Sequence, residues 1–400
     1  MIKVALLGYG TIGSGVAEVL EKNRECIAKR AGDEIEVKYV LDLRDFPGDP
    51  IQEKIVHDYE VIRNDPEVQI VVEAMGGVEP AYTFAKNALL AGKHFATSNK
   101  ALVAKHGAEL IALAKEKQLN FLFEASVGGG IPIIRPLNSC LTAEVIEEIA
   151  GILNGTTNYM MTKMSQDGSE FEDVLKDAQQ KGYAEADPTA DIEGYDACRK
   201  IAILTSLVCG RQVEFEEIHT EGITKISAAD IKYAKKLGRS MKLLALSYKM
   251  GDSYCAMVAP FMLDAAHPLY SVNGVFNAVF VHGNMLGDAM FYGSGAGKLP
   301  TASAVVADII DIANHIDENI PVEWNAEKLE LVDYRRLKSR YFVRTLADQA
   351  AVEKAFGEVS FVSAEGVTGE TAFVTSEMDG YAYETAAGTL GDILSMIRVK

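Results

Sequence analysis

Charged side chains are concentrated in one short segment, KGYAEADPTADIEGYDACRK at residues 181–200. It holds five carboxylates and three cationic side chains, and the apolar run IAILTSLVCG follows directly. Carboxylates bind ammonium groups, and a lysine transfers protons when burial or a nearby charge tunes it. The segment is therefore either a solvated surface or the polar wall of a site at the edge of a core.

Two residues at the end of this segment, Asp196 and Lys200, favour the second interpretation. They are four residues apart, so on a helix they share one face, and the alternative is a solvated ion pair of about 0.3–0.5 kcal/mol. The helix beyond Lys200 is apolar on nearly every side, so its start lies against a core. A lysine in the first turns also faces the positive end of the helix dipole, which disfavours its charge. Lys200 is thus a candidate proton-transfer group.

The N-terminal residues predict a site for a dinucleotide. IKVALLG is an apolar run of strand length, GYGTIG follows it with Gly8, Gly10 and Gly13, and a helix pattern then covers about 11–30. In such a motif the first glycine permits a tight turn, the second admits a pyrophosphate and the third lets the helix pack on the strand. The alternative is a glycine-rich turn that serves packing only.

Strand and helix patterns alternate through the rest of the N-terminal third. This alternation predicts a parallel, doubly wound α/β sheet. Further strands are expected at 34–42, 69–75, 94–98 and 120–126, and helices at 80–91 and 101–117.

Three side chains follow strands of this predicted sheet, at the edge where ligands bind in open parallel sheets. Asp42 ends the second strand, where a carboxylate favours NAD, and Arg44 lies two residues on, where a guanidinium favours NADP. Together, Asp42 and Arg44 favour NAD as the cofactor without excluding NADP. Lys100 follows the strand at 94–98 and is either a site residue or a surface lysine at a helix start.

Composition narrows the class of partner. With 57 acids, 39 bases and a formal charge of −18, the chain is a poor candidate for binding nucleic acid or an anionic membrane. Its five cysteines form no CxxC pair, which predicts free thiols in a reducing cytoplasm. No apolar run reaches the roughly 18 residues of a membrane helix. The expected partners are a small molecule and further copies of the chain, as a homodimer or homotetramer.

Six motifs together resemble those of the homoserine dehydrogenase family, over about residues 1–320. They are GYGTIG, SNKALVAKHG, EASVGGGIPIIRPL, GILNGTTNYM, the charged segment 181–200 and MFYGSGAGKLPTASAVV. The resemblance implies reversible hydride transfer between L-homoserine, or L-aspartate 4-semialdehyde, and NAD or NADP, in the pathway to threonine and methionine. A nicotinamide enzyme with an amino-acid substrate needs acids and lysines in one pocket, as the charged segment provides.

The resemblance also implies roles for individual residues. It makes Lys100 and Lys200 the catalytic acid/base lysines. The implied substrate-binding residues are Gly155, Thr156, Glu185, Asp191 and Asp196. The implied cofactor-binding residues are Gly8, Gly10, Thr11, Ile12, Gly13, Asp42, Arg44, Asn99 and Lys100.

Two of these motifs have alternative interpretations. Relatives bind a monovalent cation, Na⁺ or K⁺, at a loop like EASVGGGI, which implies Glu124, Val127, Gly129 and Ile131 as ligands, although a glycine-rich hinge needs no metal. In GILNGTTNYM, backbone N–H groups and hydroxyls suit a nicotinamide amide or the substrate carboxylate. The alternative is that Thr156 or Thr157 caps a helix, and the two roles are compatible.

The expected organisation is a dinucleotide-binding domain at 1–136, completed by a helix near 299–318, and a substrate-binding and dimerisation domain with a mixed sheet at 137–298. A β-α-β-β pattern at 335–400 resembles a shortened ACT-type module. We interpret this module as an oligomerisation or vestigial regulatory element.

Two other functions compete with this prediction. A phosphorylating semialdehyde dehydrogenase requires Cys140 to be a nucleophile, but its helical run IPIIRPLNSCL favours a cysteine packed in the protein. A catalytically silent nucleotide sensor has no need of both Lys100 and Lys200.

Overall fold

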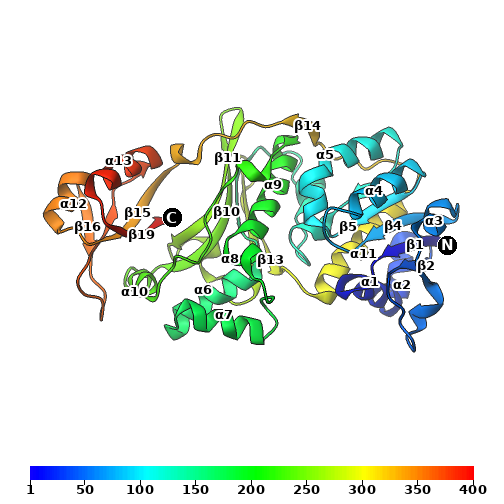
Figure 1. Cartoon of the computed structure of the whole chain (residues 1–400). Helices are drawn as coiled ribbons and strands as arrows, with labels where there is room; N and C mark the ends of the chain where they lie inside the picture. Colours follow the sequence, from blue (N-terminus) through cyan, green and yellow to red (C-terminus); the bar gives the residue numbers. More distant parts are fainter. The chain divides into compact units, whose positions relative to one another are not determined.

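The computed structural model describes the whole chain, Met1–Lys400, which divides into two compact units. The first unit comprises residues 1–144, 202–215 and 293–329. The second comprises 145–201, 216–292 and 330–400. Each unit therefore contains segments that are distant in sequence (Figure 1).

The first unit contains a six-stranded parallel sheet in the order β3-β2-β1-β4-β5-β6. The order reverses between β1 and β4, as in doubly wound folds that bind ligands at this switch point. This confirms the predicted parallel sheet, although the short strand β3 was not predicted. The strands are β1 (Ile2–Leu7), β2 (Ile35–Leu41), β3 (Ile55–Val56), β4 (Val68–Glu73), β5 (His94–Thr97) and β6 (Phe121–Leu122).

The helices of this unit connect its strands. They are α1 (Thr11–Lys22), α2 (Arg24–Ala31), α3 (Tyr59–Asn64), α4 (Ala81–Leu90), α5 (Lys100–Glu116) and α11 (Lys298–Asn314). The prediction of one helix over 11–30 was wrong. The chain breaks at Asn23, whose φ of −106° and ψ of 18° are not helical, and α2 begins after it.

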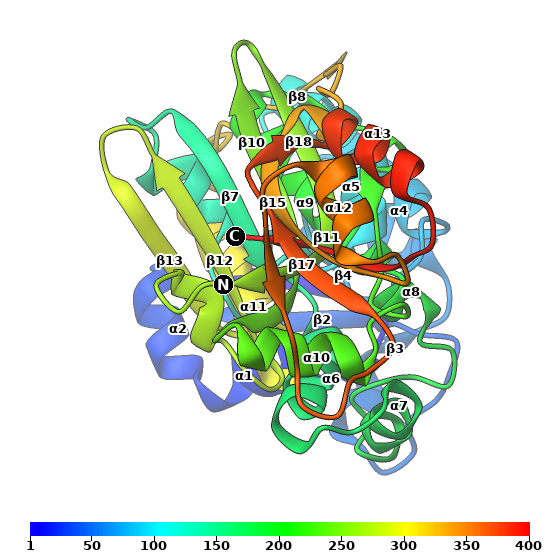
Figure 2. The same cartoon turned by 90° about the vertical axis from the view of Figure 1, so that its left-hand side faces the viewer.

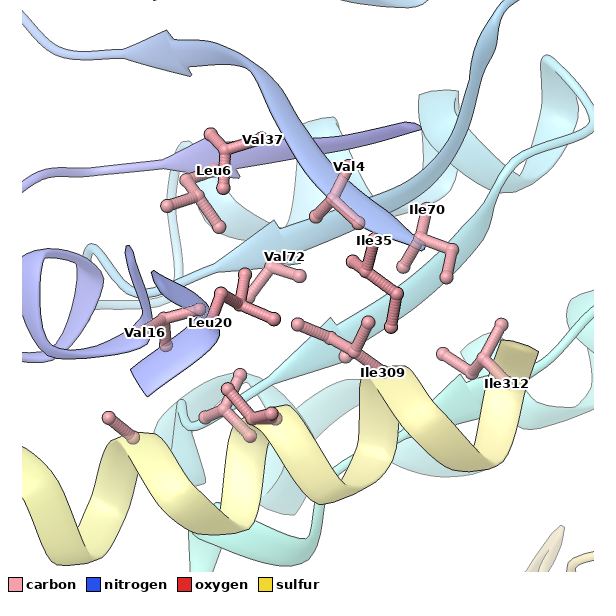
Figure 3. Close-up of a cluster of buried hydrophobic side chains, with 14 of the residues drawn as sticks. Val4, Leu6, Val16, Leu20, Ile35, Val37, Ile70, Val72, Ile309 and Ile312 are labelled. Carbon is pink, nitrogen blue, oxygen red and sulfur yellow. The ribbon is translucent and has the colours of Figure 1, made fainter. Parts of the chain in front are cut away.

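Helix α11 packs on the same sheet although it comes much later in the chain. Val305, Ile309 and Ile312 are fully buried or nearly so in one cluster with Val16 and Leu20 of α1 and with strand residues such as Val4, Leu6, Ile70 and Val72 (Figure 3). Burying an aliphatic side chain of this size stabilises a fold by about 1.5–3 kcal/mol. At Gly15 of α1 an added Cβ would lie 2.8 Å from the carbonyl oxygen of Lys298, so a glycine permits the close approach of the two helices.

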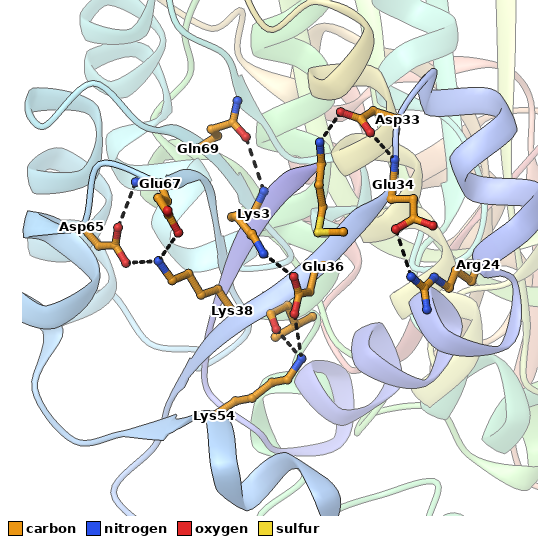
Figure 4. Close-up of polar contacts among 12 residues, drawn as sticks. Lys3, Arg24, Asp33, Glu34, Glu36, Lys38, Lys54, Asp65, Glu67 and Gln69 are labelled. Atoms are coloured by element: carbon orange, nitrogen blue, oxygen red, sulfur yellow. Dashed lines mark hydrogen bonds and ion pairs between the residues drawn. The ribbon is translucent and has the colours of Figure 1, made fainter.

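The amino-terminal ends of the strands carry charges that pair with one another (Figure 4). Lys38 binds Asp65 at 2.5 Å and Glu67 at 2.6 Å, and Lys3 binds Glu36. Arg24 binds Glu34 at 3.0 Å. The Arg24–Glu34 pair is exposed and contributes about 0–1 kcal/mol, whereas Lys38 and Asp65 are partly buried. The charged side chains at this edge of the sheet are therefore paired with one another. The side chains predicted to bind the cofactor lie at the opposite, carboxyl-terminal edge.

The second unit contains a mixed sheet of eleven strands, whose main path is β13-β12-β7-β10-β11-β19-β15-β17-β16. Its C-terminal strands are β15 (Lys338–Thr345), β16 (Val359–Val362), β17 (Thr371–Thr375) and β19 (Ile393–Val399). Long antiparallel pairings join β10 to β7 and β11, and β19 runs parallel to β11. The mixed sheet was predicted. Its central strands are β7 (Ile146–Ile152), β10 (Ser240–Met250), β11 (Ser253–Leu263), β12 (Phe276–Gly283) and β13 (Gly287–Ser294), and β9 (His219–Thr220) pairs beside β11.

Five helices lie between residues 155 and 236: α6 (Gly155–Asp167), α7 (Phe171–Gln180), α8 (Thr189–Ile192), α9 (Tyr195–Cys209) and α10 (Ala228–Lys236). The boundary between the two units falls within α9, so the residues before Ala202 belong to the second unit. In the first unit, β8 (Arg211–Gln212) pairs with β14 (Asn325–Lys328).

The C-terminal segment has a βαββαβ order with one additional short strand (Figure 2). Its elements are β15 (Lys338–Thr345), α12 (Gln349–Phe356), β16 (Val359–Val362), β17 (Thr371–Thr375), β18 (Met378–Asp379), α13 (Gly380–Leu390) and β19 (Ile393–Val399). The predicted β-α-β-β pattern was incomplete, because it lacked α13 and β19. Helix α13 contains Gly380 and Gly388, and glycine has a low helix propensity.

Across the whole chain, no helix is both long and apolar enough to span a membrane.

Candidate active site

The turn between β1 and α1 has the geometry that a dinucleotide fingerprint requires. Gly8 has a φ of +95°, and its N–H donates to the Leu41 carbonyl at 2.8 Å. A Cβ on Gly13 would lie 1.9 Å from the Gly8 oxygen, whereas a Cβ on Gly10 would meet nothing within 4 Å. The first and third glycines therefore serve the turn and the packing, and Gly10 leaves open space beside the start of α1, where Thr11 and Ile12 follow.

Asp42 follows β2 and is surrounded by donors. Its carboxylate accepts hydrogen bonds from Tyr9 N at 2.8 Å, from Arg44 N at 3.0 Å and from the Arg44 guanidinium at 2.9 Å on each oxygen. The Arg44 guanidinium is the main reason why the pKa of Asp42 lies well below its usual range. The two residues that point to different cofactors thus form one ion pair.

A buried glutamate, Glu73, organises the carboxyl ends of β4 and β5. One of its oxygens accepts from Met75 N at 2.7 Å and Gly76 N at 3.0 Å, and the other accepts from the Thr97 hydroxyl at 2.6 Å. Asn99 then caps α5 by accepting from the N–H groups of the second and third helical residues, and Lys100 is the first residue of α5. Glu73 was missed because it ends an apolar strand, although a lone acid in such a run is itself a signal.

In the second unit, the starts of α6 and α9 meet in a buried polar cluster. Lys200 and Asp196 are only 8% and 4% exposed, and Lys200 Nζ lies 2.8 Å from Asp196 Oδ2 and 2.7 Å from the Leu153 carbonyl oxygen. The Asn154 amide donates to Asp196 Oδ2 at 3.0 Å and to Asp191 Oδ1 at 2.7 Å. The structure therefore brings together Asp191, Asp196 and Lys200, and adds Asn154, which the sequence analysis did not select.

Asn154 also determines how α6 begins. Its side-chain oxygen accepts from Thr157 N at 2.9 Å, so Asn154 is the N-cap residue, and neither of the alternative cap residues, Thr156 and Thr157, has this role. The Thr156 hydroxyl instead donates to the Tyr183 carbonyl. A Cβ on Gly155 would lie 2.8 Å from the Val275 carbonyl oxygen, so a side chain there would collide with the backbone.

Glu185 does not belong to this buried cluster. Its side chain is exposed on the segment before α8.

Cys140 is also exposed, at the end of a π-helical turn that covers Pro136–Cys140, so the expectation of a packed cysteine was wrong. The π turn places the sulfur on the surface, where neighbouring side chains do not cover it.

The buried turn at residues 124–131 provides main-chain oxygens for a cation, while its one acidic side chain is already used. The Glu124 carboxylate accepts from three consecutive backbone N–H groups, those of Ile133, Ile134 and Arg135, at 2.6–2.8 Å. The carbonyl groups of Val127, Gly129 and Ile131 are not engaged as acceptors in the backbone hydrogen bonds of this turn. Gly129 has a φ of +58°, and a Cβ there would lie 2.3 Å from the Gly295 oxygen.

These features define the class of protein. A doubly wound parallel sheet with a glycine turn at its switch point binds a dinucleotide, and a second unit with a buried lysine and carboxylates suits a small polar substrate. This combination of fold and polar site is typical of nicotinamide-dependent α/β oxidoreductases.

Comparisons with known proteins identify the family. Residues 132–310 match the family model of homoserine dehydrogenase, and residues 8–124 match that of the homoserine dehydrogenase NAD binding domain. A homoserine dehydrogenase of Synechocystis sp. is 47% identical over 331 residues, covering 80% of this chain and 75% of its own. The chain belongs to the homoserine dehydrogenase family, which confirms the resemblance, and its reaction is hydride transfer between a CH–OH group of homoserine and NAD or NADP.

Solved structures agree with this assignment. The crystal structure of a homoserine dehydrogenase from Thiobacillus denitrificans has a TM-score of 0.92 at 34% identity, covering 100% of this chain and 98% of that one. A hyperthermophilic archaeal homoserine dehydrogenase in complex with NADPH has a TM-score of 0.67 at 30% identity, and covers 78% of this chain and 97% of that one.

Two alanine substitutions separate the packing function of the glycine turn from its binding function. Gly13→Ala should lower the melting temperature, because the new Cβ collides with the Gly8 carbonyl. Gly10→Ala should leave the melting temperature unchanged and weaken NAD and NADP binding, because its Cβ occupies the space that a pyrophosphate needs. Differential scanning fluorimetry and cofactor titration measure both effects, and equal cofactor affinity of Gly10→Ala and the wild type would exclude Gly10 from the site.

Proposed function

We propose that Lys200, assisted by Lys100, transfers the proton that accompanies hydride transfer. When homoserine is oxidised, a hydride leaves its hydroxyl-bearing carbon for the nicotinamide, and the hydroxyl proton passes to a lysine amine. In the reverse direction a lysine ammonium gives a proton to the aldehyde oxygen. Two observations support Lys200: it is buried, and its Nζ is held in place by Asp196 and the Leu153 carbonyl oxygen.

We also propose that Asp191 and Asp196 bind the substrate ammonium. The support is that Asn154 holds one oxygen of each carboxylate, which fixes the two groups relative to each other within the second unit. Gly155 and Thr156 lie at the N-terminus of α6, where backbone N–H groups suit the substrate carboxylate. Glu185, on an exposed segment, is proposed as a further carboxylate that contacts the ammonium.

Replacing either lysine tests the catalytic proposal. Lys200→Ala and Lys100→Ala should each lower kcat by about 10²–10⁴-fold, because a positioned proton-transfer group contributes that much. The dissociation constants of NAD and NADP should change far less. Lys176→Ala on the exposed surface of α7 is the control. Steady-state kinetics and cofactor titration give both quantities, and unchanged turnover of a folded variant would remove that lysine from the mechanism.

We propose that the chain accepts both cofactors, because Asp42 and Arg44 neutralise each other. The carboxylate of Asp42 is the acceptor that suits the ribose hydroxyl of NAD, and Arg44 offers an exposed guanidinium to the 2′-phosphate of NADP. The archaeal relative in complex with NADPH supports the second possibility.

Arg44→Ala tests this assignment. It should lower kcat/KM with NADP about 10–100-fold relative to NAD, the size of a lost hydrogen bond to a charged group. Arg24→Ala, an exposed arginine of the same unit that pairs with Glu34, is the matched control. The measurement is the ratio of kcat/KM for the two cofactors, and a parallel loss with both would contradict the assignment.

We propose a Na⁺ or K⁺ site formed by main-chain carbonyls of Glu124, Val127, Gly129 and Ile131. The support is the chemistry of the donors, since hard cations prefer oxygen ligands and these residues are buried. When bound, the cation supplies fixed positive charge that holds the turn. Glu124 contributes no side-chain oxygen in this proposal, because its carboxylate is engaged by three N–H groups.

Exchange of the cation tests this site. At constant ionic strength, NaCl or KCl should raise the melting temperature and the turnover relative to choline chloride, because a ligand that binds only the folded state stabilises it. The rise should saturate with cation concentration. Identical melting curves and rates in all three salts would exclude the site.

Finally, we propose that the C-terminal segment is an ACT-type module and that the chain forms a homodimer or homotetramer in the cytoplasm. The βαββαβ order supports the first proposal. Exposed apolar side chains near edge strand β13, namely Met285, Leu286, Met290 and Tyr292, support the second, because such patches are typical of interfaces. Five free cysteines fit a reducing compartment.

A further inference from the structure

The segment that carries the proposed substrate carboxylates is held in place by a neighbouring stretch, residues 220–223. The Ile223 N–H donates to the Ile192 carbonyl at 2.8 Å. At Gly222 an added Cβ would lie 2.2 Å from the Ile192 oxygen and 2.5 Å from Glu193 Cα, so the two backbones are in direct contact. Asp191 immediately precedes this contact, and Asp196 follows shortly after it.

Glu221 lies at the centre of the supporting stretch, and its charged side chain is held by two partners. Arg398 Nη1 lies 2.8 Å from Glu221 Oε1, and His219 Nε2 lies 2.6 Å from the same oxygen. Burial by itself would raise the pKa of Glu221, but His219 and Arg398 outweigh it, so the pKa is lowered. Glu221 is therefore an ionised carboxylate whose position depends on these partners.

Arg398 belongs to the C-terminal segment and is only 6% exposed. It lies on β19, where it pairs with Tyr341 of β15 and with Phe261 of β11. The His219 ring stacks on the ring of Tyr334 with centroids 3.6 Å apart and an angle of 12°, so Glu221's second partner is also fixed by a residue beyond 330. A continuous set of contacts thus leads from the C-terminal segment to Ile192 and Glu193.

We propose that Arg398 is a positioning residue for homoserine binding. Its guanidinium holds Glu221, Glu221 anchors the turn at Gly222, and this turn fixes the backbone between Asp191 and Asp196. The inference rests on the proposed role of these two aspartates. Without Arg398, the half-buried carboxylate of Glu221, whose side chain is 30% exposed, has one partner fewer and turns towards water, which solvates its charge. The supporting turn keeps its backbone hydrogen bond from the Glu221 N–H to the Val258 carbonyl at 2.8 Å but loses its side-chain anchor, so its position is less precisely fixed.

The test compares Michaelis constants in the full chain. Arg398→Met, which keeps the length of the side chain without its charge, should raise the KM for homoserine about two- to thirty-fold, the range of indirect effects of this kind. The KM for NAD or NADP should stay unchanged, because the cofactor residues lie in the other unit. Arg398→Lys should recover part of the loss. Arg340→Met, an exposed arginine on neighbouring β15, is the matched control and should have no effect.

Three further variants keep the test decisive. Glu221→Gln keeps the size of the side chain, so it should raise the same KM, and combining it with Arg398→Met should add little. An unchanged homoserine KM in folded Arg398→Met or Glu221→Gln, or an equal rise of both Michaelis constants, overturns the proposal. Asp196→Asn tests the substrate role directly: if it leaves the homoserine KM unchanged, that role is wrong, and the substrate side of this inference falls with it.

Discussion

The buried pair of Lys200 and Asp196 is the interaction on which the second unit's polar site depends. Moving an ammonium and a carboxylate out of water costs several kcal/mol per ion, and their attraction offsets this only when further hydrogen bonds are present. Here the Leu153 carbonyl and the Asn154 amide provide them. Both groups come from the turn between β7 and α6, so the charges are compensated only when this turn and α9 are correctly placed.

The need to compensate these buried charges also links the start of α6 to the polar site. The Asn154 side chain uses its oxygen to cap α6 and its amide nitrogen to bridge Asp191 and Asp196. A change in the cap would therefore shift the carboxylates, and a change in either carboxylate would disturb the start of α6. The side-chain atoms of Asn154 thus both stabilise the start of α6 and position the carboxylates of the site. This double role explains why so many charged groups lie at the edge of an apolar helix.

The parts of the fold that were predictable from sequence are those with local determinants. The glycine turn was predicted correctly because its strand, its three glycines and its helix follow one another within a few residues. The members of the charged segment were selected for the same reason. Asn154 was not, because its partners Asp191 and Asp196 are 37 and 42 residues away, and no local pattern indicates a pairing at that separation.

Sequence reasoning also failed where the tertiary structure overrides local preference. The helix pattern over residues 11–30 gives no indication of the break at Asn23. The glycines of α13 lower its helix propensity, so this helix was not predicted, although its Tyr383 stacks on Tyr341. The pairing of β19 with β11 depends on strands far apart in the chain. Consequently the sequence predicted a separate C-terminal module, whereas the structure continues the large sheet into it.

This continuity changes how the C-terminal segment has to be studied. Its strand β19 lies between β11 and β15, so it is an interior strand of the large sheet. Removing residues after 330 would leave part of the β11 edge unpaired, and exposed strand edges promote association with other chains. A truncated chain would lose Arg398 and Tyr334 and would expose this sheet edge, so any change in substrate affinity would have three possible causes. Only single substitutions that keep β19 in the sheet can show whether the C-terminal segment acts on the substrate site through Glu221.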